Sequence, residues 1–166
     1  MSHLTDIYGD VPYFEAGKGF IDGKFTPRYD TQEEIYNDFF AELDAAVTAF
    51  DGTKDRITGD VIYNGDINKW KKFANSLRLR LAVRICNADR SKATEVIDEL
   101  MENEQNLMTS NEDNCLLQWG DNADTRNYFY DYLVINRESN LDKLHSAGES
   151  ILMYMAPYAD PRLEKF

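Results

Sequence analysis

The chain has 166 residues, of which 43% are hydrophobic, enough for one compact domain with a core but too few for two full domains. Its 30 acidic and 18 basic residues give a net charge of −12, and no lysine and arginine cluster reverses that sign locally. Such a surface repels phosphate backbones, which excludes nucleic acid as a partner. No apolar run approaches the roughly 20 residues needed to cross a bilayer, so we expect the chain itself to be soluble.

The first part of the chain, residues 5–30, is predicted to be an irregular lead-in. Gly17, Gly19 and Gly23 favour positive backbone angles, and Pro27 blocks a helix. A segment with so few apolar residues in a periodic pattern has little core of its own. We therefore expect it to lie over other parts of the structure.

Three amphipathic helices are predicted within residues 31–104. The first begins at Thr31, which forms a capping-box pair with Glu34, and ends at Gly52. Asp66 is the predicted cap of the second helix, and the third spans about residues 90–104. The apolar faces of the three helices, in chain order, consist of Ile35, Phe39, Leu43, Ala46, Val47 and Phe50; Ile67, Trp70, Phe73, Ala74, Leu77, Leu81 and Ile85; and Ala93, Val96, Ile97, Leu100 and Met101.

The second helix is basic in an otherwise acidic chain, so we expect its lysines and arginines to pair with acidic neighbours. Similar aromatic positions in the first two helices lie about 34 residues apart, the tetratricopeptide period. The predicted fold class is therefore mainly α, with tetratricopeptide-like helical hairpins and loop-rich insertions in a single domain over residues 1–166. Residues 105–166 form a loop-rich region, in which extended stretches at 114–119 and 127–135 leave room for one short β-hairpin. A final helix opens at Ser146, paired with Glu149, and ends by Pro157.

Cys86 falls on a predicted helix and Cys115 in a predicted strand, at a spacing that matches no metal-ligand or redox motif. We interpret both as small buried residues, with one disulfide between them as the alternative. The chain holds no His-Glu-x-x-His helix, no Cys/His cluster and no glycine-rich phosphate loop. No catalytic, metal-binding or cofactor-binding residue is predicted.

Aromatic residues are the feature that points to a ligand. They gather in the loop-rich region, as Trp119, Tyr128, Phe129, Tyr130 and Tyr132. Sugars present flat C–H faces to such rings, so this region is a candidate glycan site, although aromatic rings more often pack against helices as core. Because side chains alternate along a strand, the three tyrosines would share one face. The candidate glycan-binding residues are thus Trp119, Tyr128, Tyr130 and Tyr132.

Several motifs carry a resemblance to a known family. They are Tyr8-Gly9-Asp10-Val11-Pro12-Tyr13, then Tyr29-Asp30-Thr31-Gln32-Glu33-Glu34-Ile35-Tyr36, then Gly59-Asp60, Tyr63, Gly65-Asp66, and Lys69-Trp70-Lys71-Lys72-Phe73-Ala74-Asn75-Ser76-Leu77-Arg78-Leu79-Arg80, with Ser150 and Asp160-Pro161-Arg162 near the end. In order and spacing over nearly the whole chain, the sequence resembles the SusD/RagB family of Bacteroidetes nutrient-binding outer-membrane lipoproteins.

The resemblance implies a surface-exposed lipoprotein of the outer membrane. Family members carry four tetratricopeptide-like helix pairs, bind glycans or in some cases peptides, and deliver them to a SusC-like TonB-dependent transporter without acting as enzymes. They take part in polysaccharide utilisation and nutrient uptake. Members are about three times longer, so we interpret this chain as an internal fragment that lacks the N-terminal lipid anchor and the C-terminal part.

Three functional hypotheses follow. The leading one is a non-enzymatic glycan-binding module beside a SusC-like transporter. The second is a helical protein-interaction scaffold with no ligand site of its own, and the third is an acidic glycosidase, supported only by abundant carboxylates. An excised fragment should expose apolar patches where neighbouring helices pack, so we also expect it to self-associate.

Overall fold

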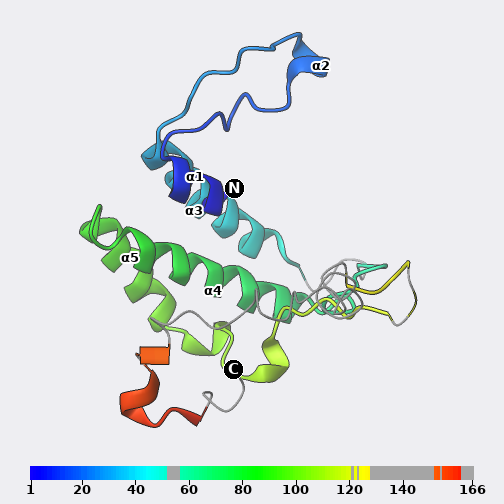
Figure 1. Ribbon diagram of the computed structural model, residues 1–166, viewed down its shortest axis with the longest axis vertical. Coiled ribbons are helices and arrows are strands. Elements are labelled where there is room, and N and C mark those ends of the chain that lie inside the picture. Colours follow the sequence, from blue (N-terminus) through cyan, green and yellow to red (C-terminus); the bar gives the residue numbers. More distant parts are fainter. Residues whose placement is uncertain (52–56, 121, 123, 128–151, 154, 162–166) are drawn as a thin grey trace, which may run out of the picture. The chain divides into compact units, whose positions relative to one another are not determined.

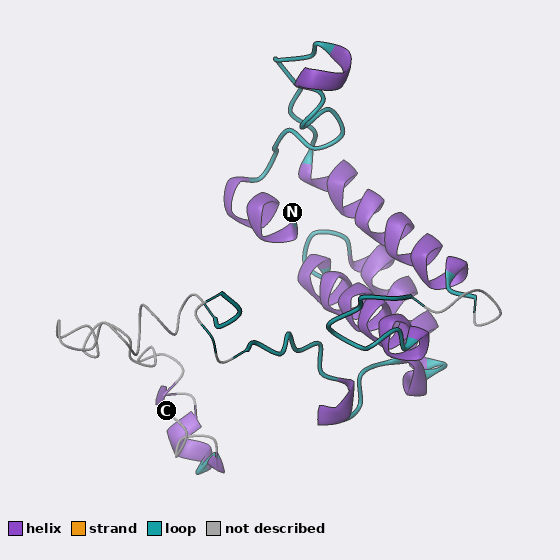
Figure 2. Cartoon of the chain, turned by 90° about the vertical axis from the view of Figure 1, so that its right-hand side faces the viewer, coloured by secondary structure: helices purple, strands orange, loops and turns teal. Residues whose placement is uncertain are grey.

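The computed structural model describes residues 1–166 except 52–56, 121, 123, 128–151, 154 and 162–166. It divides into two compact units, Met1–Leu117 and Gln118–Phe166. The described residues are helices and loops and contain no strand, as Figure 2 shows, so the mainly α fold class is confirmed. The single-domain organisation stays a prediction.

The helix α3 (Gln32–Ala49) begins as the sequence predicts. Thr31 accepts a hydrogen bond from the Glu34 backbone N–H at 3.2 Å, and Glu34 accepts one from the Thr31 N–H at 3.0 Å, completing the capping box. The helix ends at Ala49, with Phe50 as its extended C-cap residue. The end is therefore earlier than predicted, and Gly52 lies outside the described residues.

The helices α4 (Ile67–Ile85) and α5 (Arg90–Met101) follow, each capped by an aspartate. Asp66 accepts hydrogen bonds from the N–H groups of Asn68 and Lys69, as predicted, and Asp89 accepts one from Lys92. The helix α5 is shorter than the predicted 90–104, because residues Glu104–Asn106 form the short 3-10 helix η1. A second 3-10 helix, η2 (Asn111–Asp113), closes this part of the chain.

The core of the first unit lies where α3 and α5 pack against α4 (Figure 1). Its buried cluster consists of Tyr36, Phe40, Leu81, Ala82, Val96 and Leu100. Leu81 of α4 and Val96 and Leu100 of α5 lie on the predicted apolar faces, whereas Ala82 of α4 was not predicted to be in the core. On α3 the buried face is rotated toward Tyr36 and Phe40, while Ala46, predicted to be inside, is exposed.

The lead-in is more ordered than the sequence predicts. It contains α1 (Ser2–Tyr8), which ends where Gly9 adopts a positive φ of 72°, and the single turn α2 (Gly19–Asp22). No glycine or proline interrupts residues 2–8, so nothing prevents a helix there. Val11 and Asp30 then exchange two backbone hydrogen bonds, of 3.2 and 3.0 Å, which close the base of a loop over residues 12–29.

Two further predictions are wrong. Residues 114–119 form no strand, because an extended segment needs a partner for its backbone groups and this one has no ladder. Cys86 is exposed rather than buried, because it follows the last residue of α4; both it and the half-buried Cys115 are free thiols, so no disulfide forms. The predicted strand at 127–135, apart from Asn127, and the Ser146–Glu149 pair lie outside the described residues.

The second unit, Gln118–Phe166, is described only in part. Its described residues include backbone hydrogen bonds that join Gly120 to Thr125 and Asn122 to Arg126, and the 3-10 helix η5 (Ala156–Tyr158), which has a proline in its first turn. Ala159 ends η5 with a left-handed φ of 47°.

Candidate functional site

Trp119 is the predicted glycan-binding residue that the structure describes. This residue is 52% exposed, so it lies at the surface of the described structure. An exposed indole offers a flat apolar face with one polar edge, which suits the C–H face of a sugar ring. The role of this ring in glycan binding stays a prediction.

A compact turn holds the chain next to Trp119. The Gly120 N–H donates to the Thr125 carbonyl at 2.9 Å, and the Asn122 Oδ1 accepts from the Thr125 N–H at 3.1 Å and from its hydroxyl at 2.9 Å. A Cβ at position 120 would lie 2.1 Å from the Thr125 Oγ1, so any other residue there would force Thr125 to shift. The indole of Trp119 thus lies next to a pair of residues in close contact.

The other three candidates, Tyr128, Tyr130 and Tyr132, lie outside the described residues, as does Phe129. That these tyrosines bind glycan together with Trp119 stays a prediction.

Several aspartates of the family-like motifs are structural. Asp60 accepts hydrogen bonds from the N–H groups of Ile62, Tyr63 and Gly65 and from the indole N–H of Trp70, at 2.8–3.2 Å. Burial raises the pKa of Asp60, but these four donors outweigh burial and bring the pKa to about 2. This carboxylate joins the loop before α4 to the helix itself.

Asp30 and Asp113 are structural carboxylates of the same kind, which accept hydrogen bonds from the chain's own N–H groups. Asp30 is fully buried and accepts from the N–H groups of Tyr13 at 2.9 Å and Phe14 at 2.8 Å. Asp113 accepts from Lys72 of α4 at 3.0 Å and from the Thr109 N–H at 3.0 Å, and its pKa is lowered chiefly by Lys72. These carboxylates are occupied by the chain's own donors.

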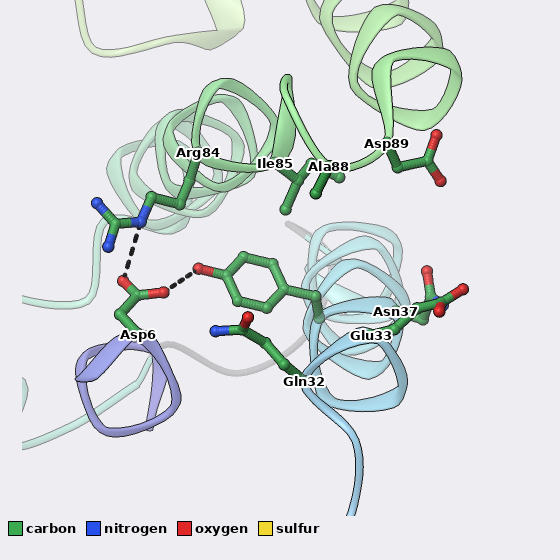
Figure 3. A pocket seen from close by; sticks show the side chains of 9 residues that line it. Asp6, Gln32, Glu33, Asn37, Arg84, Ile85, Ala88 and Asp89 are labelled. Carbon is green, nitrogen blue, oxygen red and sulfur yellow. Dashed lines mark hydrogen bonds and ion pairs between the residues drawn. The ribbon is translucent and has the colours of Figure 1, made fainter. Parts of the chain in front are cut away.

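A pocket that the sequence did not predict lies among α1, α3 and the C-terminal end of α4 (Figure 3). We call it the polar pocket; its volume is about 420 Å³. Asp6 lines one side of it, accepts a 2.5 Å hydrogen bond from the Tyr36 hydroxyl and lies 3.4 Å from the Nε of Arg84 (Figure 3). Burial, and then the bond to Asp6, raise the pKa of Tyr36 to about 12, so its hydroxyl stays a donor.

The remaining lining of the polar pocket combines polar and apolar groups. Gln32 is fixed by a 2.8 Å hydrogen bond from its Nε2 to the Thr5 carbonyl, while Ile85 and Ala88 supply apolar surface. Asp6, Tyr36 and Arg84 stand on three separate helices far apart in the sequence. No local pattern or motif could have placed them together.

The described residues offer no group of three histidine, cysteine or acidic side chains that could hold a metal ion. Within the same residues, no helix is both long enough and apolar enough to span a bilayer.

Comparison with known proteins settles the family. The model of SusD-like proteins, described as starch-binding and associating with the outer membrane, matches residues 1–166. The chain belongs to the SusD-like family. No curated protein matches the sequence.

Solved structures of SusD-like proteins agree with this assignment. A SusD homologue from Bacteroides uniformis is 37% identical with a TM-score of 0.76; the match covers 98% of this chain and 33% of that one. A chitin-binding protein is also 37% identical, with a TM-score of 0.72, over 98% of this chain and 32% of its own. A chitin-binding SusD homologue from Flavobacterium johnsoniae is 33% identical with a TM-score of 0.61, over 68% of this chain and 24% of that one.

This SusD-like chain therefore spans about a third of the length of its closely matching relatives. The recognised motifs at Asp30, Asp60 and Trp70 hold loops and helix ends in place. These residues have structural roles in this chain and do not identify a ligand.

Proposed function

We propose that this SusD-like chain is a non-catalytic glycan-binding part of an outer-membrane nutrient-uptake system. The observation that carries the proposal is the exposed Trp119 on its glycine-dependent turn, in a chain whose relatives include chitin-binding proteins. An indole displayed in this way provides stacking surface for a sugar ring. Tyr128, Tyr130 and Tyr132 are proposed to extend that surface.

The electrostatics of the described carboxylates support binding over hydrolysis. A glycosidase needs one carboxylic acid whose pKa is raised so that it can protonate the leaving group. Each described carboxylate with a shifted pKa, such as Asp60, is shifted downward by hydrogen-bond donors or cations. These groups are ionised near neutral pH and occupied by the chain's own donors.

The family suggests the partners. We propose that a SusC-like TonB-dependent transporter receives the oligosaccharide and that the parent protein is a surface-exposed outer-membrane lipoprotein. The net charge of −12 argues against nucleic acid as a ligand.

A second candidate function is a protein-interaction scaffold without a ligand site. It is favoured by the loop over residues 12–29, whose tip exposes Phe20 completely and leaves Ile21 and Phe25 largely exposed. Apolar side chains gathered on an exposed loop are typical of a contact surface.

The two candidates are separated by titrating the chain with N-acetylglucosamine hexamer and maltoheptaose in a calorimeter. We expect saturable binding of at least one oligomer, weakened about tenfold in Trp119→Ala by loss of stacking, which is worth about 1–1.5 kcal/mol. Tyr29→Ala, which removes another exposed aromatic ring, is the matched control and should bind as the native chain does.

Two results would contradict the glycan proposal. If neither oligomer binds to the folded chain, the scaffold function replaces it. If either oligomer is cleaved during a long incubation, the non-catalytic assignment is wrong.

A further inference from the structure

The polar pocket has the composition of a saccharide site. Sugar recognition needs planar side chains that reach neighbouring hydroxyls and a small apolar surface for the C–H face. Asp6, Gln32 and Arg84 supply the planar groups, and Ile85 and Ala88 supply the apolar surface. About 420 Å³ lies within the range of small-ligand sites and accommodates one or two sugar units.

The chain's own hydrogen bonds orient part of the pocket lining before a ligand binds. Asp6 is held by the Tyr36 hydroxyl on one oxygen and approached by Arg84 on the other, and the Gln32 amide is oriented by its bond to Thr5. Bonds of this kind set the direction of each polar group before a ligand arrives. That lowers the entropy cost of binding.

Another part of the lining consists of side chains that make no bond to other described residues. Glu33 and Asn37 lie on the exposed side of α3 and line the pocket, and their side chains make no hydrogen bond or ion pair with any described residue. The amide of Asn37 offers both donors and an acceptor, and the carboxylate of Glu33 offers acceptors. These two side chains remain available for ligand hydroxyls.

Charge restricts which sugar enters. Three carboxylates line the pocket, from Asp6, Glu33 and Asp89, against the single guanidinium of Arg84. A uronic acid would bring a fourth carboxylate into this surrounding, whereas a neutral sugar would not and an amine would find opposite charge.

We propose that the polar pocket is a second saccharide site, for one or two neutral or amine-bearing sugar units, in a different unit of the chain from Trp119. The inference rests on the proposed glycan-binding function and adds a site and a selectivity to it. The acidic lining makes the site discriminate against uronic acids.

The test titrates the full 166-residue chain with three disaccharides: glucosamine disaccharide, N-acetylglucosamine disaccharide and digalacturonate. The pocket variants are Glu33→Gln combined with Asn37→Ala, and separately Ala88→Trp, which fills the cavity. Glu102→Gln, on an exposed carboxylate outside the pocket, is the matched control. Circular dichroism establishes that each variant is folded.

We expect the amine-bearing and neutral disaccharides to bind and digalacturonate to bind at least tenfold more weakly. The Glu33→Gln and Asn37→Ala double variant should weaken binding about tenfold, as expected for the loss of one or two hydrogen bonds to the ligand. Ala88→Trp, which occupies the cavity, should weaken binding at least as much. The Glu102→Gln and Trp119→Ala chains should retain this binding.

The alternative outcomes are distinct. If Trp119→Ala abolishes all sugar binding and the pocket variants change nothing, the pocket proposal is overturned while the glycan-binding function stands. If digalacturonate binds as tightly as the neutral sugar, the selectivity is wrong, and if no disaccharide or longer glycan binds, both proposals fall.

Discussion

The indole N–H of Trp70 donates a 2.8 Å hydrogen bond to the Oδ2 of Asp60, ten residues earlier in the chain. The same carboxylate organises the turn that precedes α4, and the Trp70 ring contacts Tyr63 and Phe73 edge to face. This hydrogen bond therefore connects the loop before α4, the start of α4 and the cluster of aromatic rings. The exchange Trp70→Phe keeps most of the ring and removes the donor.

We expect Trp70→Phe to lower the free energy of unfolding by about 1 kcal/mol, the usual value of one hydrogen bond in proteins. Urea unfolding followed by circular dichroism measures it. In the background of Asp60→Asn the same exchange should cost less, since the acceptor is changed. An equal cost in both backgrounds would show that the bond contributes nothing.

The stability of the chain should depend on pH through Asp60. Its pKa of about 2 in the folded chain lies below the ordinary value of 3.8, so the unfolded chain binds more protons between these values. Stability from this group is complete above about pH 4 and is lost as the pH falls toward 2. Melting temperatures measured from pH 2 to 6 should therefore drop more steeply for the native chain than for Asp60→Asn; parallel curves would contradict the shifted pKa.

Buried Arg78 joins the three helices of the core. Its guanidinium lies 3.0 Å from Glu99 of α5 and 3.5 Å from Asp44 of α3, and both partners are largely exposed. Removing the arginine thus leaves no buried charge behind, and its aliphatic stem is the main loss. We expect Arg78→Ala to destabilise the chain by about 2–3 kcal/mol and Arg78→Met, which keeps most of the volume, by about 1 kcal/mol. Equal losses in denaturant unfolding would mean that the ion pairs, and not packing, carry the effect.

The turn beside Trp119 should tolerate no side chain at position 120. In Gly120→Ala the new methyl group meets the Thr125 Oγ1 at 2.1 Å, so Thr125 must shift next to the indole of Trp119. We expect a change in tryptophan emission and about fivefold weaker binding of the oligomer that the native chain binds. Thr125→Gly in the same chain removes the clash and should restore both signals; failure to restore them would place the cause elsewhere.

Self-association is expected through the loop over residues 12–29. Replacing Phe20, Ile21 and Phe25 together by serine removes its exposed apolar surface without touching Asp30 at its base. Light scattering across a concentration series should then show a lower mean mass than for the native chain. Val83→Ser, on an exposed position of α4, is the control, and a native chain that stays monomeric at high concentration would contradict the expectation.

Local features of this fold could be predicted from the sequence. The Thr31–Glu34 capping box and the Asp66 cap depend on residues within one turn, so a short window contains the whole interaction. The α1 helix could not be predicted from the glycines and prolines of the lead-in, because these lie after residue 8 and leave residues 2–8 free to form a helix. Cys86 is exposed because it lies at the C-cap of α4, where the side chain is no longer covered by the neighbouring helices.

The polar pocket could not be predicted, for a physical reason. Asp6, Tyr36 and Arg84 meet only because α3 packs on α4 and α1 then lies against both. Nothing in the local sequence around any one of them differs from an ordinary exposed helix face. For the same reason the sequence alone could not decide whether Trp119 is exposed or buried, because burial depends on which segments pack nearby.

The base of the loop over residues 12–29 has a consequence for how the protein tolerates change. The Val11–Asp30 backbone pair and the hydrogen bonds that the Tyr13 and Phe14 N–H groups donate to the Asp30 carboxylate close the loop independently of what lies at its tip. A protease that nicks the tip would therefore leave both ends anchored, and residues inserted there would lengthen the loop without disturbing α3. This position is suited to accept a tag or a fluorescent label.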